Sequence, residues 1–248
     1  MMSSSSTQTS IFSSRSSCSC RAIKTTRRQK QSAKIVRASS VTEPATKIQF
    51  NEKSENNANL QLLGVGAREK KIAILTVKVY AVAMYADASK MTASDVDLLN
   101  GDFEKEILIQ LNMNVEGKDF FKALEEALVP RISRIATDMA TKEDDEGNFM
   151  TTTAEYSEQC EELALEELEL IRDGLCSKSG GSKKLEKGAK ISFTFKESGG
   201  DVAMVMSSSG AEITFKSYEL ARALLDVYVG DDPISVEAKK AFELGASR

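Results

Sequence analysis

An arginine and a tyrosine inside a long apolar stretch are the side chains of this chain best suited to chemistry. The stretch "LLGVGAREKKIAILTVKVYAVAMYAD" carries Arg68 and, twelve positions later, Tyr80. An arginine in such surroundings either ends in water at a sheet edge or is held in the interior by a partner. A guanidinium beside a phenol presents several donors in a fixed geometry that a carboxylate matches. The pair therefore suggests an anion site, and a solvated surface arginine remains the alternative.

The path of the chain decides whether these two side chains can meet. On one straight strand, residues twelve apart are separated by roughly 40 Å, at ~3.3 Å per residue. Arg68 and Tyr80 can face each other only if two strands reverse near Ile74, so that facing positions sum to about 148. The obvious turn residues, Glu69 to Lys71, would place the reversal too early and keep the pair apart.

Other motifs exclude several kinds of site. The Gly64-Val65-Gly66 sequence lies within a strand pattern, whereas a nucleotide loop opens a helix. Small residues inside a strand more often allow another backbone to approach closely. The chain has no histidine, and outside its first forty residues only Cys160 and Cys176 occur, which excludes the usual zinc sites and imidazole triads. We therefore expect no metal and no cofactor.

The first 38 residues differ in composition from the rest of the chain. They are rich in serine, contain eight Lys or Arg and precede the first acidic residue, Glu43. This composition is typical of a plastid or mitochondrial transit peptide, and the high serine and threonine content favours the plastid. A basic arm that binds nucleic acid or membrane is the alternative. We expect residues 1–38 to be removed in the chloroplast stroma, followed by a linker at 39–45 and one domain at 46–246.

The charge of the remaining chain argues against nucleic-acid binding. Removal of residues 1–38 leaves 25 basic against 37 acidic residues, a net charge of −12. Binding to a phosphate backbone depends instead on clustered Lys and Arg. No segment approaches the ~18 apolar residues that a membrane-spanning helix needs.

Residue patterns predict an α+β fold with an antiparallel sheet that carries helices on one face. Ser217 and Ser235 are expected to cap two of the helices, and Pro130 to end or kink another near its middle. The expected strands cover 47–53, 60–68, 71–87, 106–113, 189–198, 201–208 and 211–216, and the expected helices cover 117–140, 152–176, 218–229 and 236–245.

Several motifs, in order along the chain, resemble the chalcone isomerase-like superfamily. They are the strand pair around "GVGAR" and "VKVYAVAMYAD", the helix start "AEYSEQCEE", and the C-terminal "ARALLDVYVGDDPIS". The resemblance spans roughly residues 46–245. It implies an open-faced β-sandwich, with a large antiparallel sheet, a layer of helices and a cleft between them. It also implies that Arg68 and Tyr80 lie close together on facing strands.

The resemblance distinguishes two branches of this superfamily. The catalytic isomerases carry a threonine at the position of Tyr80, where it holds a reaction water. They also carry a tyrosine at Tyr156 and, seven residues later, an asparagine where this chain has Leu163. Loss of two polar contacts argues against isomerase chemistry.

The arginine–tyrosine pair and the leader instead resemble the plastid fatty-acid-binding proteins, in which this pair holds the carboxylate. We therefore expect non-catalytic binding of a free fatty acid of medium to long chain. The alternatives are a chalcone–flavanone isomerase and a non-catalytic partner of another enzyme.

Strand parity, helix spacing and the resemblance also suggest which side chains line the cleft. The apolar candidates could equally be plain core residues. The candidates are Tyr156, Leu163, Met84, Lys78, Phe120 or Phe121, Leu124 and Leu128.

Overall fold

The folded domain begins earlier than the sequence suggests. A computed structural model of the chain describes residues 39–72, 75–91, 96–140, 154–176, 183–198 and 201–247. The chain divides into two units, 1–37 and 38–248, and the predicted transit peptide lies outside the described residues. Residues 39–45, expected as a linker, instead contain strand β1 (Ser40–Thr42) and the buried Glu43, which is 3% exposed. β1 pairs with β2 (Gln49–Asn51), so this segment belongs to the fold.

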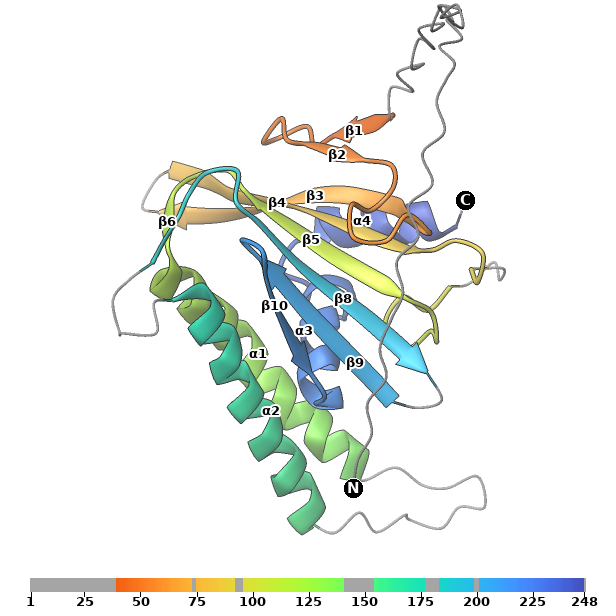
Figure 1. The fold of residues 1–248 in the computed structure, drawn as a ribbon, viewed down its shortest axis with the longest axis vertical. Coiled ribbons are helices and arrows are strands. Elements are labelled where there is room, and N and C mark those ends of the chain that lie inside the picture. Colours follow the sequence, from red (N-terminus) through yellow and green to blue (C-terminus); the bar gives the residue numbers. More distant parts are fainter. Residues whose placement is uncertain are drawn as a thin grey trace, which may run out of the picture. The chain divides into compact units, whose positions relative to one another are not determined.

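A six-stranded antiparallel sheet forms the centre of the second unit (Figure 1). Its strand order is β10-β9-β8-β5-β4-β3, and every neighbouring pair is antiparallel. The strands are β3 (Leu60–Ile72), β4 (Leu75–Asp87), β5 (Lys105–Leu111), β8 (Lys190–Ser198), β9 (Asp201–Ser208) and β10 (Ala211–Phe215). The short strands β6 (Val115–Glu116) and β7 (Lys184–Leu185), which the sequence pattern missed, pair with each other.

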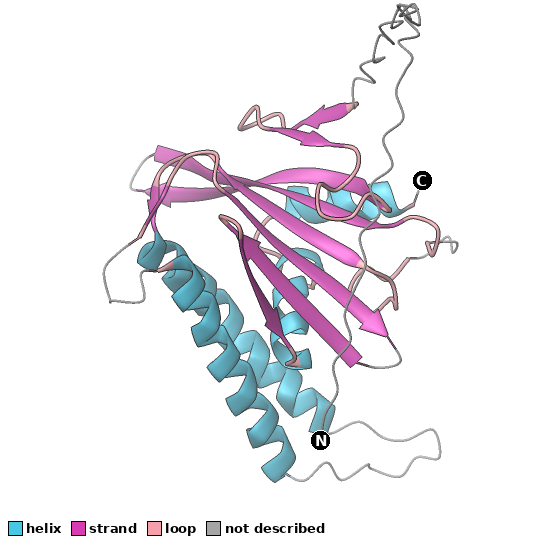
Figure 2. Cartoon of the chain, viewed as in Figure 1, coloured by secondary structure: helices cyan, strands magenta, loops and turns pink. Residues whose placement is uncertain are grey.

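Four helices pack on one face of this sheet, as the sequence predicts (Figure 2). They are α1 (Gly117–Ala140), α2 (Ala154–Leu175), α3 (Tyr218–Val229) and α4 (Val236–Ala246). The predicted caps are confirmed: Ser217 accepts a hydrogen bond from the Leu220 amide, and Ser235 accepts one from the Ala238 amide. The antiparallel α+β architecture is therefore confirmed.

Helix α1 does not end at Pro130, contrary to expectation. It continues to Ala140 with the proline inside it. Proline removes one backbone hydrogen bond from a helix. Leu128 and Ile132, on either side of it, are both fully buried, and this packing retains the helical path on both sides of the proline.

The two faces of the sheet have separate cores. Val82 and Met84 of β4 point into the large core under the helices. Ala83 and Tyr85 point to the opposite face, where Phe50 of β2 covers a smaller apolar cluster. The central strands are thus buried on both sides, which accounts for their nearly continuous apolar sequence.

Glycines in β3 allow α4 to pack directly against the strand. A Cβ atom added at Gly64 would lie 2.5 Å from the Ala241 carbonyl oxygen, and one at Gly66 would overlap Ala238. The interpretation of these glycines as sites of close backbone approach, rather than a phosphate loop, is therefore confirmed.

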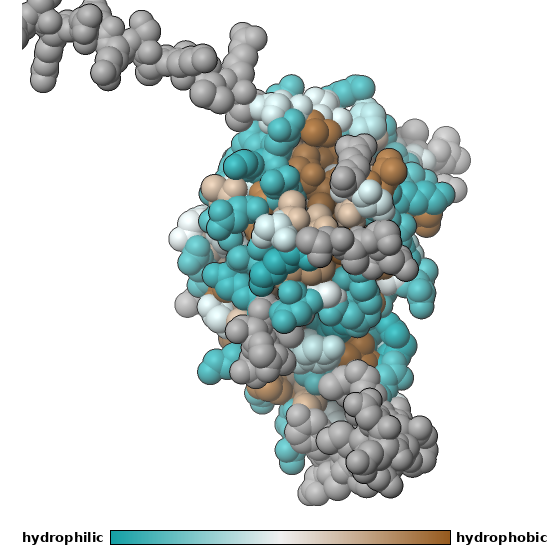
Figure 3. Space-filling view, turned by 90° about the vertical axis from the view of Figure 1, so that its right-hand side faces the viewer, coloured by the Kyte–Doolittle hydropathy of each residue, from teal (hydrophilic) through white to brown (hydrophobic). Residues whose placement is uncertain are grey.

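The face shown in Figure 3 is mostly hydrophilic, with hydrophobic residues gathered in small patches. Within the described residues, no helix combines the length and the apolar character that a membrane span requires.

Candidate functional site

The β3–β4 hairpin brings Arg68 and Tyr80 together. From Gly64 to Arg68 the facing residues sum to 148, and Arg68 is the direct partner of Tyr80. Ile72 pairs with Leu75, so the reversal falls between them, whereas Ile74 itself lies outside the described residues. The predicted register is confirmed, and a reversal at Glu69 to Lys71 is excluded.

A β-bulge at Val79 turns Lys78 away from this pair. Arg68 pairs with Tyr80 and the next residue, Glu69, pairs with Lys78, so Val79 is the extra residue of β4. Beyond the bulge the alternation of side chains reverses. The Lys78 ammonium group therefore donates to the Ala45 carbonyl oxygen at 3.1 Å, beside β1 and β2. The expectation that Lys78 lies on the same face as Arg68 is wrong for this reason.

Three side chains form the polar end of the site. The Arg68 guanidinium carbon lies 5.7 Å from the centre of the Tyr80 ring, a cation–π distance. The Tyr80 and Tyr228 hydroxyl oxygens are 3.0 Å apart, and both tyrosines are almost fully buried. The pKa of the Tyr228 hydroxyl is raised well above its usual value, mainly by burial and next by the neighbouring Tyr80. The Arg68 charge acts in the opposite direction but does not outweigh them. Tyr228 therefore stays a neutral hydrogen-bonding group.

The charge of Arg68 has no partner among the described residues. Arg68 is half-buried, and within the described part of the chain no hydrogen bond or ion pair reaches its guanidinium. A half-buried cation of this kind is favourable only when an anion or water completes its surroundings.

A pocket of about 310 Å³ opens beside this polar end. It lies where the turn end of the β3–β4 hairpin meets β6 and the start of α1 (Figure 1). One side is formed by the hairpin and the other by the first turns of α1. The lining residues are Arg68, Lys70, Val77, Val79, Tyr80, Met113, Asn114, Val115, Glu116, Asp119, Phe120, Ala123 and Lys184.

Helix α1, rather than α2, supplies the helical wall. The backbone of α2 begins beside the far end of α1, because the Ser157 hydroxyl donates to the Ala136 carbonyl oxygen at 2.9 Å. Ala136 is sixteen residues beyond Phe120, or ~24 Å along a helix at ~1.5 Å per residue. The backbone of Tyr156 belongs to this first turn of α2, and its side chain is outside the described residues.

Leu163 lies outside the pocket. Its side chain is 45% exposed on α2. The expectation that Leu163 lines the cleft is therefore wrong, whereas the side chain of Tyr156 lies outside the described residues and its place in the cleft stays a prediction.

The other expected lining residues belong to the core. Met84, Phe121, Leu124 and Leu128 are all at most 6% exposed and pack in the large core cluster. Phe120 was the alternative to Phe121, and it is Phe120 that lines the pocket, with its ring centre 6.0 Å from that of Tyr80. The plain-core interpretation applies to the remaining four.

Sequence reasoning missed Tyr228, Val77, Val79, Met113 and Val115. Tyr228 lies on the buried side of α3, where an apolar helix pattern does not distinguish a hydroxyl that contacts another element. Val77 and Val79 have the wrong parity for Tyr80 on a regular strand, and only the bulge brings all three to one face. Met113, which is 38% exposed, was a visible signal, since an exposed large apolar residue beside a strand end often marks a binding surface.

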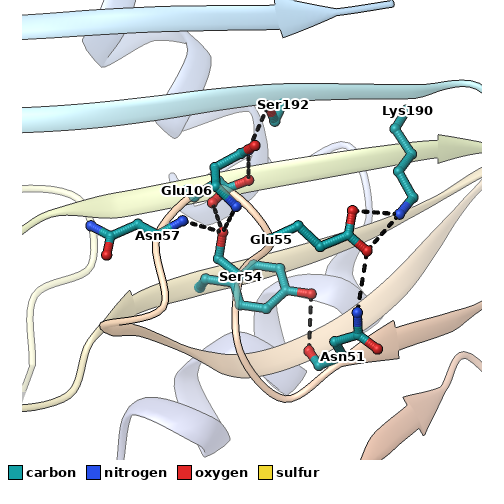
Figure 4. A network of polar contacts seen from close by, with 9 residues as sticks. Asn51, Ser54, Glu55, Asn57, Glu106, Lys190 and Ser192 are labelled. Atoms are coloured by element: carbon teal, nitrogen blue, oxygen red, sulfur yellow. Dashed lines mark hydrogen bonds and ion pairs between the residues drawn. The ribbon is translucent and has the colours of Figure 1, made fainter. Parts of the chain in front are cut away.

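A second polar cluster lies on the opposite face of the sheet (Figure 4). The Glu106 carboxylate, which is 1% exposed, accepts hydrogen bonds from the Ser54 hydroxyl and, at 2.7 Å, from the Asn56 amide. Burial is the largest influence on this group and raises the pKa of Glu106. The cluster fastens the segment after β2 to β5, and the described residues include no group of acidic, Cys or His side chains able to hold a metal ion.

Comparison with known proteins shows the fold. No family model matches the sequence, and no curated protein matches it. Among solved structures, a fatty-acid binding protein of Arabidopsis thaliana is similar, with a TM-score of 0.58 at 20% sequence identity. The match covers 84% of this chain and 98% of that chain. The predicted chalcone isomerase-like fold is thereby confirmed.

Proposed function

We propose that this protein binds free fatty acids without catalysis, with the carboxylate held by Arg68 and Tyr80. The observation that carries the proposal is the half-buried guanidinium that no described residue pairs with, next to the apolar part of the pocket wall. The similar solved structure, a fatty-acid binding protein, supports the same class of ligand.

The chemistry of the pocket suits an amphipathic acid. A hydrogen bond to a charged group contributes ~1.5–3 kcal/mol, and burial of an alkyl chain contributes ~0.8 kcal/mol per methylene. Val77, Val79, Val115 and Phe120 provide the apolar surface for the chain. The tail therefore supplies most of the affinity, and the arginine selects the acid over neutral lipids.

Of the two arguments against an isomerase, the one from Leu163 no longer applies and the one from Tyr80 remains. Leu163 is exposed and says nothing about catalysis. Tyr80, however, lines the pocket where the isomerases place a threonine, and its hydroxyl is bound to Tyr228. This arrangement favours binding over the positioning of a reaction water.

The composition of residues 1–38 supports a location in the chloroplast stroma. In this compartment we propose a role in the transfer of free fatty acids between synthesis and export.

The test compares two arginines that lie over tyrosine rings. Arg68 is 5.7 Å from the Tyr80 ring, and Arg222, outside the pocket, is 5.9 Å from the Tyr218 ring. Delipidated protein is titrated with dodecanoate by native mass spectrometry and calorimetry. We expect one bound acid per chain and a loss of about tenfold or more in affinity for Arg68→Gln, the value of a charge-assisted hydrogen bond.

Arg222→Gln should bind dodecanoate as the parent protein does. Failure of the parent protein to take up the acid, or equal affinity in Arg68→Gln, would contradict the proposal. Cyclisation of a chalcone above its spontaneous rate would contradict its non-catalytic part.

A further inference from the structure

We infer that the pocket selects medium-chain fatty acids, of about eight to ten carbons, and that longer tails gain no further affinity. The inference rests on the proposed function and specifies its ligand. It follows from the closed inner end of the pocket, from the charges at its mouth and from its volume.

The inner end of the pocket is closed behind Tyr80 and Phe120. The two rings lie 6.0 Å apart, and the Tyr80 hydroxyl is hydrogen bonded to Tyr228. Further along β4 and α1, Val82, Met84 and Leu124 are buried in the core and do not line the pocket. A carboxylate on Arg68 therefore lies at the inner end, and its tail has to run outward.

The path of the acyl tail out of the pocket is short and ends at charged side chains. The chain passes Val79 and Val77 on the hairpin side and Val115 and Ala123 on the other. The mouth then carries charged side chains of both signs. These are Lys70, Glu116, Asp119 and Lys184, of which the two lysines and Asp119 are exposed. A methylene beyond this point leaves apolar surface for water and hydrated charges, so it gains no burial.

The volume of the pocket gives the same limit. A group of the size of a water molecule occupies about 30 Å³, so 310 Å³ holds about ten non-hydrogen atoms. Ten atoms less the two carboxylate oxygens leave about eight carbons, and about ten carbons fit when the oxygens lie against Arg68 and take up none of this volume. An acid of about eighteen carbons has roughly twice as many atoms as the pocket holds.

A series of chain lengths tests this inference on the unmodified protein. Dissociation constants are measured by displacement of a fluorescent acid, for straight-chain acids of about six to about sixteen carbons, all below their micelle concentrations. We expect affinity to rise about fourfold per methylene up to about ten carbons and then to level off. A rise that continues to sixteen carbons would overturn the inference and leave the proposed function intact. No binding of any acid would overturn both.

A matched pair of substitutions places the limit at this pocket. Ala123→Leu adds three carbons to the pocket wall, whereas Ala127→Leu makes the same change one turn later on α1, outside the pocket. We expect the levelling point to move about three carbons shorter in Ala123→Leu and to stay unchanged in Ala127→Leu. A levelling point that is the same in both variants would overturn the inference, and if Ala123→Leu does not fold, the chain-length series alone decides.

Discussion

At the scale of single residues, the two tyrosines at the inner end of the pocket have different roles. Tyr80 lines the pocket and packs on Arg68, whereas Tyr228 reaches only the Tyr80 hydroxyl and lies outside the pocket lining. Two hydroxyl groups carry two hydrogens, and the bond between them uses one. The second hydrogen can then be donated by Tyr80 to a ligand oxygen while Tyr228 donates to Tyr80.

This difference predicts that removal of the Tyr80 hydroxyl weakens binding, whereas removal of the Tyr228 hydroxyl mainly lowers stability. Tyr80→Phe should weaken dodecanoate binding about tenfold, because it removes a donor to a charged acceptor. Tyr228→Phe should change binding less than about twofold, because its hydrogen bond exists with and without ligand, but should lower the free energy of unfolding by about 1–3 kcal/mol. Calorimetric titration and urea unfolding measure the two quantities.

Tyr85→Phe is the control for these substitutions. Its buried hydroxyl donates to the Asn51 carbonyl oxygen at 3.1 Å on the opposite face of the sheet. Tyr85→Phe should lower the free energy of unfolding and leave the affinity for dodecanoate unchanged. A large loss of binding in Tyr228→Phe would show that this hydroxyl contacts the ligand itself.

At the scale of elements, hairpin register was predictable and the bulge was not. The Arg68–Tyr80 pairing was implied by the resemblance to the superfamily, whereas the residues alone left a reversal at Glu69 to Lys71 open. The inserted Val79 has no sequence signal of its own, and it moved Lys78 to the other face. A single extra residue inverts all later parity in a strand, so side-chain alternation predicts a face only between bulges.

The helical wall was misassigned for a related reason. Both α1 and α2 have an apolar stripe, and the sequence cannot show which end of each helix lies at a site. The tertiary contact between Ser157 and Ala136 places the start of α2 away from the pocket. Phe120 was recognisable as a helical residue near the sheet, but only the packing of its ring on Tyr80 distinguishes it from Phe121.

The packing of α4 on β3 gives a prediction at this scale. Gly64→Ala places a methyl group 2.5 Å from the Ala241 carbonyl oxygen, so the helix has to move away from the strand. We expect the free energy of unfolding to fall by about 1–3 kcal/mol, as in other overpacked cores. Urea unfolding measures it, and an unchanged or increased stability would show that α4 shifts without cost.

At the scale of the whole domain, the sheet separates two polar centres with different roles. The helix face holds the pocket with Arg68, which pairs with no described residue, whereas the opposite face holds Glu106 with a hydrogen bond to each carboxylate oxygen. In the pocket, the Arg68 guanidinium still needs an anion from a ligand. On the opposite face, the Glu106 carboxylate already accepts hydrogen bonds from Ser54 and Asn56. We therefore expect the pocket to determine binding and the Glu106 cluster to determine how stability depends on pH.

The direction of that pH dependence follows from the raised pKa of Glu106. Burial disfavours the charged form, and the nearby Glu104 and Glu55 act in the same sense, against the hydrogen bonds from Ser54 and Asn56. The folded state therefore holds the proton more tightly than the unfolded state, in which the pKa is near 4.5. The contribution of Glu106 to stability is present below pH 4.5 and is lost as the pH rises through the folded pKa.

Glu106→Gln removes this titration and keeps the length and the acceptor oxygen of the side chain. Between pH 4.5 and neutral pH, the stability of the variant relative to the parent protein should increase with pH, because only the parent protein has to ionise the buried carboxyl at position 106. Glu212→Gln, at an exposed position of β10, should leave the curve unchanged. Thermal unfolding across this range measures the difference, and parallel curves for Glu106→Gln and the parent protein would show that Glu106 titrates alike in the folded and unfolded states.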